Sequence, residues 1–341
     1  MNWPLIISNT LFTGISIQAI AFILAAIGVN MHFGYTGLLN FGQAAFGAVG
    51  AYTFAVLAGT GIPWPGTGDA PGFFEQPWPW WAAGLAVLPM ATFLALLLGV
   101  PTLRLRADYL AIVTIAAAEI LRQALIAPKL DEQFATGGAD GLQGFSRGIE
   151  SINPWDGQTF RLWKQPFDGH QAFVMVIGWL LIVLCSVVMW LLMRSPWGRV
   201  LKSIREDEDA ARSLGKNVFA YKMQSLIIGG IVGALGGMIF AVGGRAAAPA
   251  RVPHPTALEA ADAGPVGVGH QEPVRLGQFV EAGLLFLSQV TRNSLLPDWL
   301  VNEWRFGLLR FMFVGLGLAL LVVFRPQGIF GDRREQAFDV R

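Results

Sequence analysis

The sequence is poor in charged residues. Of its 341 residues, 14% are charged while 54% are hydrophobic, and the mean hydropathy is +0.51. A soluble domain carries about 25% charged residues, so this chain has too few to cover a surface that faces water. The shortage extends along the whole sequence. It excludes an ordinary soluble protein and indicates a protein that crosses the membrane several times.

Residues that could carry out a reaction are also scarce. Cys185 is the only cysteine, so the chain cannot form an internal disulfide. The four histidines, at positions 32, 170, 254 and 270, are scattered, and no cluster of His, Glu or Cys has the spacing of metal ligands. The G-x-x-x-x-G-K-[ST] phosphate loop does not occur. We therefore expect no catalytic residues, metal, cofactor or nucleic-acid partner, and any ATP hydrolysis must come from another polypeptide.

Long hydrophobic runs are what the sequence has in abundance. A helix needs about 20 apolar residues to cross a bilayer; seven runs meet this length, and a shorter run at 282–296 is ambiguous. The seven candidate spans are residues 5–29, 41–59, 80–102, 108–127, 172–193, 223–243 and 307–324. We expect one all-α polytopic integral membrane domain over residues 1–341, a glycine-packed bundle of roughly seven to ten transmembrane or re-entrant helices.

The first two runs are separated by residues 30–40, which read NMHFGYTGLLN. This stretch holds too many glycines for a regular helix and is too apolar for a solvated loop. Irregular backbone within the bilayer is tolerated where protein buries it or where it lines a wet cavity. We therefore expect a broken or re-entrant element near the axis of the bundle.

The distribution of basic residues predicts the orientation, because short cytoplasmic loops are rich in Lys and Arg. No Lys or Arg precedes Arg104, whereas the loop 194–222 holds seven: Arg194, Arg199, Lys202, Arg205, Arg212, Lys216 and Lys222. This loop and the tail 325–341 are expected in the cytoplasm. The loop 128–171 and the N-terminus are expected outside.

Amides occur beside glycines at the start of the second run. In a helix that includes residue 40, Asn40, Gln43, Gly47 and Gly50 would share one face. Amides at membrane depth need polar partners, on a neighbouring helix or along the path of a solute, and both explanations stay open. Asn40, Gln43 and Gly47 are the candidates for lining such a path.

A later run, GGIVGALGGMIF, carries a second glycine pattern. Gly229, Gly233 and Gly237 form a tandem GxxxG series, which lets transmembrane helices approach closely. We expect these three glycines to serve helix packing.

Glu119 lies inside the candidate span 108–127. A lone carboxylate in a membrane is costly and would suggest an ion-coupled transporter. Arg122 follows three residues later, however, so the two side chains can pair along one helix face, and we expect this structural pair.

The polar segment between the spans 172–193 and 223–243 predicts two short helices. Ser195 and Pro196 form a helix start, and WGRVLKSI then places its apolar residues on one side. The acidic run 206–209 would open the second helix, where the macrodipole favours negative charge, and Gly215 would end it. A solvated loop explains the basic residues but not the acidic run, which favours a surface that docks a soluble partner.

The second helix contains DAARSLG, which looks like the EAA---G signature in the cytoplasmic loop of ABC-importer permeases, with Asp209 in place of the usual Glu. Five motifs occur in the order typical of the branched-chain amino acid permease family and resemble its LivM-like branch. They are GYTGLLNFGQAAFGAVGAY, LRADYLAIVTIAAAEILR, GGADGLQGF, SPWGRVLKSIREDEDAARSLGKNVFAYK and FRPQGIFG.

This resemblance implies a permease subunit of an ATP-driven importer in the inner (plasma) membrane of a prokaryote. Its partners would be a second homologous permease, two cytoplasmic ATPase subunits and an extracytoplasmic solute-binding protein. The solute would be a branched-chain or other aliphatic amino acid, moved by alternating access. The alternatives are a permease for urea or short amides, or a secondary transporter driven by an ion gradient. The residues expected to couple to the ATPase are Arg205, Glu206, Asp209, Ala210, Ala211 and Gly215.

Residues 252–285 depart from the family pattern. Where a further apolar span is usual, the sequence reads ALEAADAGPVGVGHQEPVRLGQFVEAG, which is too polar to cross lipid as a helix. Divergence, a solute-facing external segment and a local reading-frame slip in the gene are the three explanations. We expect residues 245–305 to form an atypical external or re-entrant segment.

Overall fold

The computed structural model describes residues 12, 14–59, 78–103, 107–126, 142–143, 145–162, 165–244 and 246–247, and most of this part is helical. The long elements are α2 (Ile17–Val29), the π-helix η1 (Asn30–Tyr35), α3 (Gln43–Ala58), α4 (Trp80–Thr102), α5 (Ala107–Ile126), α8 (Gly169–Arg194) and α11 (Val218–Gly244). The short elements are α7 (Arg147–Glu150), α9 (Pro196–Glu206), α10 (Glu208–Ser213), β1 (Leu142–Gln143), β2 (Thr159–Leu162), β3 (Gln165–Asp168) and β4 (Ala246–Ala247).

The helices lie where the hydrophobic runs predict them, because an uninterrupted apolar run of this length is stable in lipid only as a helix. Among the described residues, four helical stretches are long and apolar enough to cross a membrane: Ile17–Tyr35, Trp80–Thr102, Gly169–Arg194 and Val218–Gly244. The prediction of a mostly helical, polytopic membrane protein is confirmed. The predicted run 282–296, the span 307–324 and the tail 325–341 lie outside the described residues.

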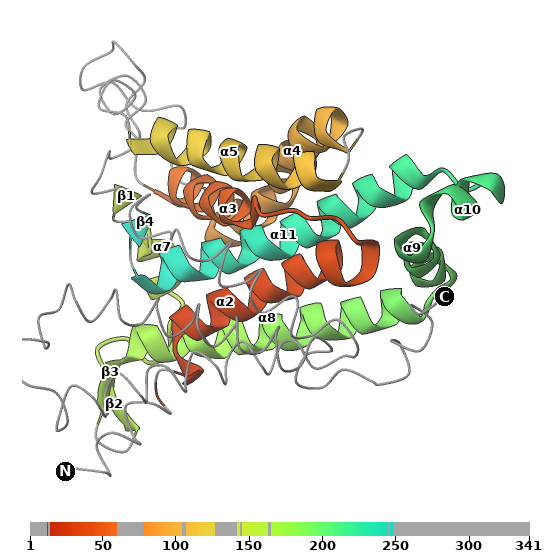
Figure 1. The fold of residues 1–341 in the computed structure, drawn as a ribbon. Helices are drawn as coiled ribbons and strands as arrows, with labels where there is room; N and C mark the ends of the chain where they lie inside the picture. Colours follow the sequence, from red (N-terminus) through yellow and green to blue (C-terminus); the bar gives the residue numbers. More distant parts are fainter. Residues whose placement is uncertain are drawn as a thin grey trace, which may run out of the picture.

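Helix α11 is the central element of the bundle. It packs against α2, α3, α4 and α8, and Figure 1 shows α2 and α8 on one side of it with α3, α4 and α5 on the other. Small residues make this possible, because α11 buries several glycines where its neighbours approach.

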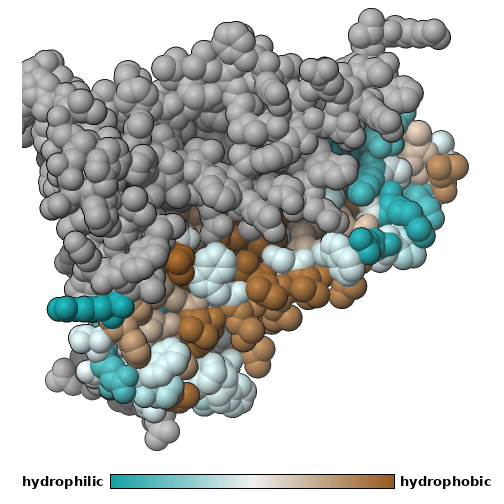
Figure 2. All heavy atoms as spheres, turned by 90° about the horizontal axis from the view of Figure 1, so that it is seen from below, coloured by the Kyte–Doolittle hydropathy of each residue, from teal (hydrophilic) through white to brown (hydrophobic). Residues whose placement is uncertain are grey.

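Helix α8 turns an apolar face away from the bundle. Leu180 is 70% exposed and Leu184 is 58% exposed. Figure 2, seen from this side, shows an apolar band with hydrophilic residues at both of its ends. In water such a continuous apolar surface would favour aggregation, whereas the hydrocarbon of a bilayer accommodates it.

The polar segments gather at the two ends of the bundle. Helices α9 and α10 lie at one end, while α7 and the four strands lie at the other (Figure 1). The strands form two antiparallel two-stranded sheets, β1 with β4 and β2 with β3, which the expectation of an all-α chain did not include. The predicted loop 194–222 and the described part of the predicted loop 128–171 therefore lie at opposite ends, and the assignment of each end to a side of the membrane stays a prediction.

Candidate docking hairpin and solute cleft

The polar segment after α8 folds into α9 and α10, which we call the α9–α10 hairpin (residues 196–215). Pro196 occupies the start of α9, as predicted, because its fixed φ suits that position and its missing N–H has no helical partner there. Leu201 and Ile204 are 0% and 3% exposed, whereas Arg199 is exposed. The predicted amphipathic helix is therefore present, with its apolar side against the bundle.

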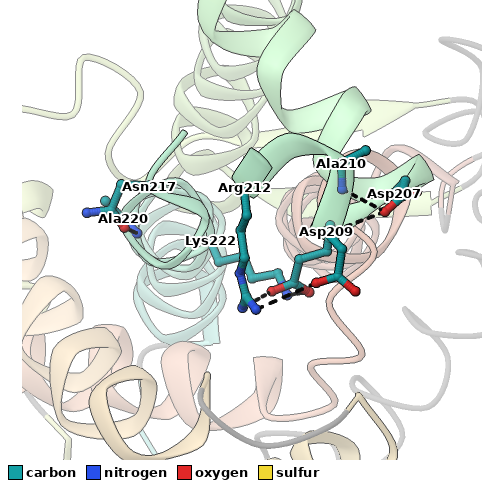
Figure 3. A network of polar contacts seen from close by, with 8 residues as sticks. Asp207, Asp209, Ala210, Arg212, Asn217, Ala220 and Lys222 are labelled. Atoms are coloured by element: carbon teal, nitrogen blue, oxygen red, sulfur yellow. Dashed lines mark hydrogen bonds and ion pairs between the residues drawn. The ribbon is translucent and has the colours of Figure 1, made fainter. Parts of the chain in front are cut away.

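The acidic run 206–209 is divided between the two helices. Glu206 is the last residue of α9, so the prediction that the whole run opens the second helix is wrong for this residue. Asp207 is the N-cap of α10: its Oδ1 accepts hydrogen bonds from the backbone N–H groups of Asp209 and Ala210, each at 2.9 Å (Figure 3). This capping starts a new helix at residue 208 and separates α10 from α9.

An ion pair between Glu208 and Lys222 holds α10 against α11. Glu208 also accepts a hydrogen bond of 2.6 Å from Arg212 of its own helix, and Figure 3 shows Arg212 and Lys222 on the same side of α10. Asp209 lies 3.8 Å from Arg212 as well, but its side chain is 93% exposed. Asp207 and Glu208 thus stabilise the hairpin, and Asp209 is accessible from outside.

Helix α10 ends at Ser213, and Gly215 follows as the C′ residue that terminates it, as predicted. Gly215 has a φ of +76°, which L side chains rarely adopt. Its N–H bonds to the carbonyl of Arg212, and the N–H of Lys216 bonds to the carbonyl of Ala211, the two bonds of a Schellman motif. The preceding residue, Leu214, is 78% exposed. The C-terminal end of α10 therefore exposes a large apolar side chain.

The six residues predicted to couple to an ATPase do not share one surface. Ala211 is 2% exposed and packs with Ile204 and Val218 beneath the hairpin. Arg205 reaches toward the bundle, where its Nη1 donates a hydrogen bond of 2.6 Å to the carbonyl oxygen of Gly34. The four that are exposed without such inward contacts are Glu206, Asp209, Ala210 and Gly215.

The interruption between α2 and α3 begins later than predicted. Residues 30–35 stay helical as the π-helix η1, so the expectation that they hold no regular helix is wrong. Single π turns occur frequently at functional sites. The helix ends before Gly37, whose φ of +72° turns the chain back toward α3. Because α3 starts only at Gln43, Asn40 is not on the helical face predicted for it.

Buried side chains fasten η1 to α11. The fully buried ring of His32 has Nε2 at 3.2 Å from the carbonyl oxygen of Leu226 and Nδ1 at 3.1 Å from the amide nitrogen of Asn40. The Oδ1 of Asn40 accepts the N–H of Gly42 at 2.9 Å, which fixes the orientation of the amide. Nδ1 must therefore accept and Nε2 must donate, so the network assigns a neutral imidazole with its proton on Nε2.

Hydroxyl groups complete this network. Thr36 Oγ1 donates to the carbonyl of Met31 at 3.1 Å and lies 2.6 Å from Ser225 Oγ, and Thr114 Oγ1 accepts the N–H of Phe41 at 3.1 Å. Thr36, Ser225 and Thr114 are all buried. Neither His32 nor these hydroxyls were identified from the sequence, because a single polar residue in an apolar run has no spacing that reveals its partner.

The tandem glycines of α11 lie against η1 and α3. A Cβ added at any of the three would collide with a neighbour: at Gly229 with His32, at Gly233 with the amide of Gln43, and at Gly237 with the carbonyl of Gly47. Polar side chains and backbone of the neighbouring elements thus occupy the space that larger residues would fill.

Gln43 and Gly47 line a small, half-open cleft between α2, α3 and α11, with a cavity volume of about 40 Å³. The Nε2 of Gln43 donates to the carbonyl of Gly229 at 3.1 Å, while its Oε1 has no hydrogen-bond partner among the described residues. The walls are mainly apolar and include Phe22 and Phe240. Asn40, the third residue predicted for a solute path, does not line this cleft.

Glu119 and Arg122 form the predicted pair. Arg122 donates two hydrogen bonds to the carboxylate, at 3.0 and 2.7 Å, and Gln123 donates a third at 2.8 Å. The carboxylate is therefore satisfied by its own helix.

The described residues thus form an apolar helical bundle of membrane-spanning length with a polar hairpin packed against one of its ends. Residues 11–267 match the family described as the permease component of branched-chain amino acid transport systems. The high-affinity branched-chain amino acid transport system permease protein LivM of Escherichia coli K12 is 32% identical over 98% of this chain and 73% of its own length. The nucleoside ABC transporter permease protein NupC of Lactococcus lactis is 28% identical over 60% of this chain and 59% of its own length. No solved structure gives a significant match.

The chain belongs to the family of branched-chain amino acid transport permeases, which are integral proteins of the inner membrane. It is a transporter component of the ABC class and not a member of a known enzyme family. The resemblance noted in the sequence is thus confirmed.

Proposed function

We propose that the chain is one of two homologous permease subunits of an ABC importer whose solute is a branched-chain or other aliphatic amino acid. The observation that carries this proposal is the α9–α10 hairpin, which is fastened to the bundle by its inner face and exposes Leu214 and Asp209 outward. A polar, rigid hairpin that ends in an exposed leucine is suited to enter a groove of a soluble partner. Two cytoplasmic ATPase subunits would bind here and hydrolyse ATP, since this chain has no phosphate loop of its own.

The remaining partners would bind elsewhere on the chain. A solute-binding protein would deliver the solute to the opposite end, where α7 and the strands lie (Figure 1). The second permease would complete the path beside the cleft between α2, α3 and α11, whose open side this chain leaves uncovered in its described part.

The cleft suits an aliphatic solute better than a strongly polar one. Its walls are apolar, and Gln43, whose buried Oε1 has no hydrogen-bond partner among the described residues, is the one residue with a polar side chain among those that line it. Gln43 and Gly47 would line the path. Asn40 would not touch the solute but would hold His32 in place. The glycines of α11 would allow the helices to move while they stay in close contact.

A transporter driven by an ion gradient would need a free intramembrane carboxylate or an ion site on a broken helix. Glu119, which raised this alternative, is held by Arg122 and Gln123. The pairing favours the ATP-driven importer.

The hairpin can be tested by co-purification with the ATPases encoded beside the gene. Leu214→Asp combined with Asp209→Arg should abolish ATPase binding, because both side chains are exposed and their change does not disturb the bundle. A matched double variant at the other end, Ile152→Asp with Asp156→Arg, changes an exposed apolar and an exposed acidic residue in the same way and should retain the ATPases. Equal ATPase recovery with both double variants would contradict the proposal.

A further inference from the structure

We propose that Arg205 is a positioning residue for transport, which links α9 to the end of η1 and carries movements of the hairpin into the membrane. The inference rests on the proposed function. The sequence suggested that Arg205 contacts the ATPase, whereas the structure shows that it contacts Gly34 inside the permease.

The first support is the chemistry of the contact. Gly34 lies in the last turn of η1, where helix carbonyls lack partners within the helix and carry the negative end of the dipole. The guanidinium of Arg205 is always charged and donates to this carbonyl at 2.6 Å. A charge-assisted hydrogen bond of this kind is stronger than one between neutral groups.

The second support is the turn that follows. Gly37 has a φ of +72°, and a Cβ at this position would lie 3.3 Å from Cγ of Arg205. The aliphatic part of Arg205 therefore covers the turn while its charged end holds the carbonyl before it. Because Arg205 contacts both Gly34 and Gly37, the turn between η1 and α3 cannot move relative to α9 without breaking these contacts.

The third support is that Arg205 lies between the hairpin on one side and the chain that leads to the cleft on the other. Arg205 lies in the last turn of α9, next to the buried Ile204, so a displacement of the hairpin displaces Arg205 with it. Beyond Gly37 the chain leads within a few residues to Gln43, at the start of α3 and on the cleft. Arg205 is thus the contact through which the hairpin acts on the broken element directly.

Coupling between distant sites requires an element with two discrete arrangements, and η1 is the candidate for that element. A π turn contains one residue more than the α-helix around it, so it can convert to regular α spacing by a local shift. His32 and Met31 of η1 are bonded to Leu226 and Ser225 of α11, and Thr36, between Gly34 and Gly37, lies 2.6 Å from Ser225 Oγ. A shift of the end beside Arg205 would therefore act on α11 as well as on the chain that leads to α3.

The test uses the complete importer in proteoliposomes, with the second permease, the ATPases and the binding protein. Arg205→Ala is compared with Arg205→Lys, which keeps one charged donor, and with Arg161→Ala, which removes an exposed arginine from β2, outside the hairpin. Three quantities are measured: ATPase subunits bound per permease, ATP hydrolysed, and leucine taken up per ATP. Thermal melting in detergent reports whether each variant is folded, and Arg205→Gln, which retains an N–H donor, replaces Arg205→Ala if the latter fails to assemble.

We expect Arg205→Ala to bind the ATPases and hydrolyse ATP normally, while leucine uptake per ATP falls about ten-fold, the effect of losing one charge-assisted bond. Arg205→Lys should recover part of this ratio, and Arg161→Ala should behave as the wild type. An unchanged ratio in Arg205→Ala, or a loss of uptake that merely follows a loss of bound ATPase, would overturn the inference. A wild type that takes up no solute with ATP would instead overturn the proposed function.

Discussion

His32 on η1 and Leu226 on α11 are joined by a hydrogen bond of 3.2 Å although 194 residues separate them in the chain. The same ring accepts a hydrogen bond from Asn40, so one side chain holds η1, the turn after it and α11 together. This junction fixes where the broken helix ends and therefore where α3 begins.

Replacing this ring should destabilise the fold. His32→Ala leaves a buried amide and a buried carbonyl without their partner, which costs about 2 kcal/mol or more. His170→Ala is the matched control: that ring is also buried but makes one hydrogen bond, to Val242, and its Nδ1 has no partner among the described residues. Thermal unfolding in detergent should show the larger loss for His32→Ala. A loss of equal size in both variants would mean that the additional hydrogen bond from Asn40 to His32 contributes nothing to stability.

The contacts of the glycines in α11 predict that replacing two of them by alanine has very different effects on stability. Gly237→Ala would drive a methyl group into the backbone carbonyl of Gly47, which cannot rotate away, and should cost about 1–3 kcal/mol or prevent folding. Gly244→Ala, near the end of the same helix, has no neighbouring atom within 4 Å of the added methyl group and should be tolerated. Folded yield and melting temperature distinguish the two. Similar behaviour of both variants would show that the helices can separate there without cost.

Asp207 is predicted to determine the start of α10. Asp207→Ala removes two hydrogen bonds to the first turn and should weaken the helix by about 1 kcal/mol. Hydrogen exchange of the peptide 207–214 should accelerate several-fold. Asp209→Ala, whose side chain is 93% exposed, should leave the exchange nearly unchanged. If the two variants exchange alike, capping is not what divides α9 from α10.

Gln43 is predicted to affect transport more than folding. Gln43→Met keeps the length of the side chain but removes its acceptor and the bond to Gly229, so uptake should fall about ten-fold while ATPase binding is retained. Thr92→Val, which removes a hydroxyl bonded within α4, is the control and should transport normally. Normal uptake by Gln43→Met would exclude Gln43 from the solute path.

The sequence was most informative where one physical demand acts on many consecutive residues. Lipid requires an unbroken apolar run, so the span predicted at 80–102 coincides with α4, Trp80–Thr102. Helix capping is equally local, which is why Pro196 and Gly215 marked the limits of the hairpin correctly.

The sequence was least informative where partners are distant or belong to the backbone. The partner of His32 is the carbonyl of Leu226, and that of Arg205 is the carbonyl of Gly34, so no pattern of side chains reveals either contact. Asn40 was misplaced for a related reason: helical spacing was extended across Gly42, although the helix starts only after it.

The most direct test of the account measures uptake of labelled leucine by the complete importer in proteoliposomes, with ATP supplied and with only an ion gradient imposed. The account predicts uptake that depends on ATP and disappears when Leu214→Asp and Asp209→Arg prevent ATPase binding. Uptake driven by the gradient alone, unaffected by these changes in the α9–α10 hairpin, would contradict it.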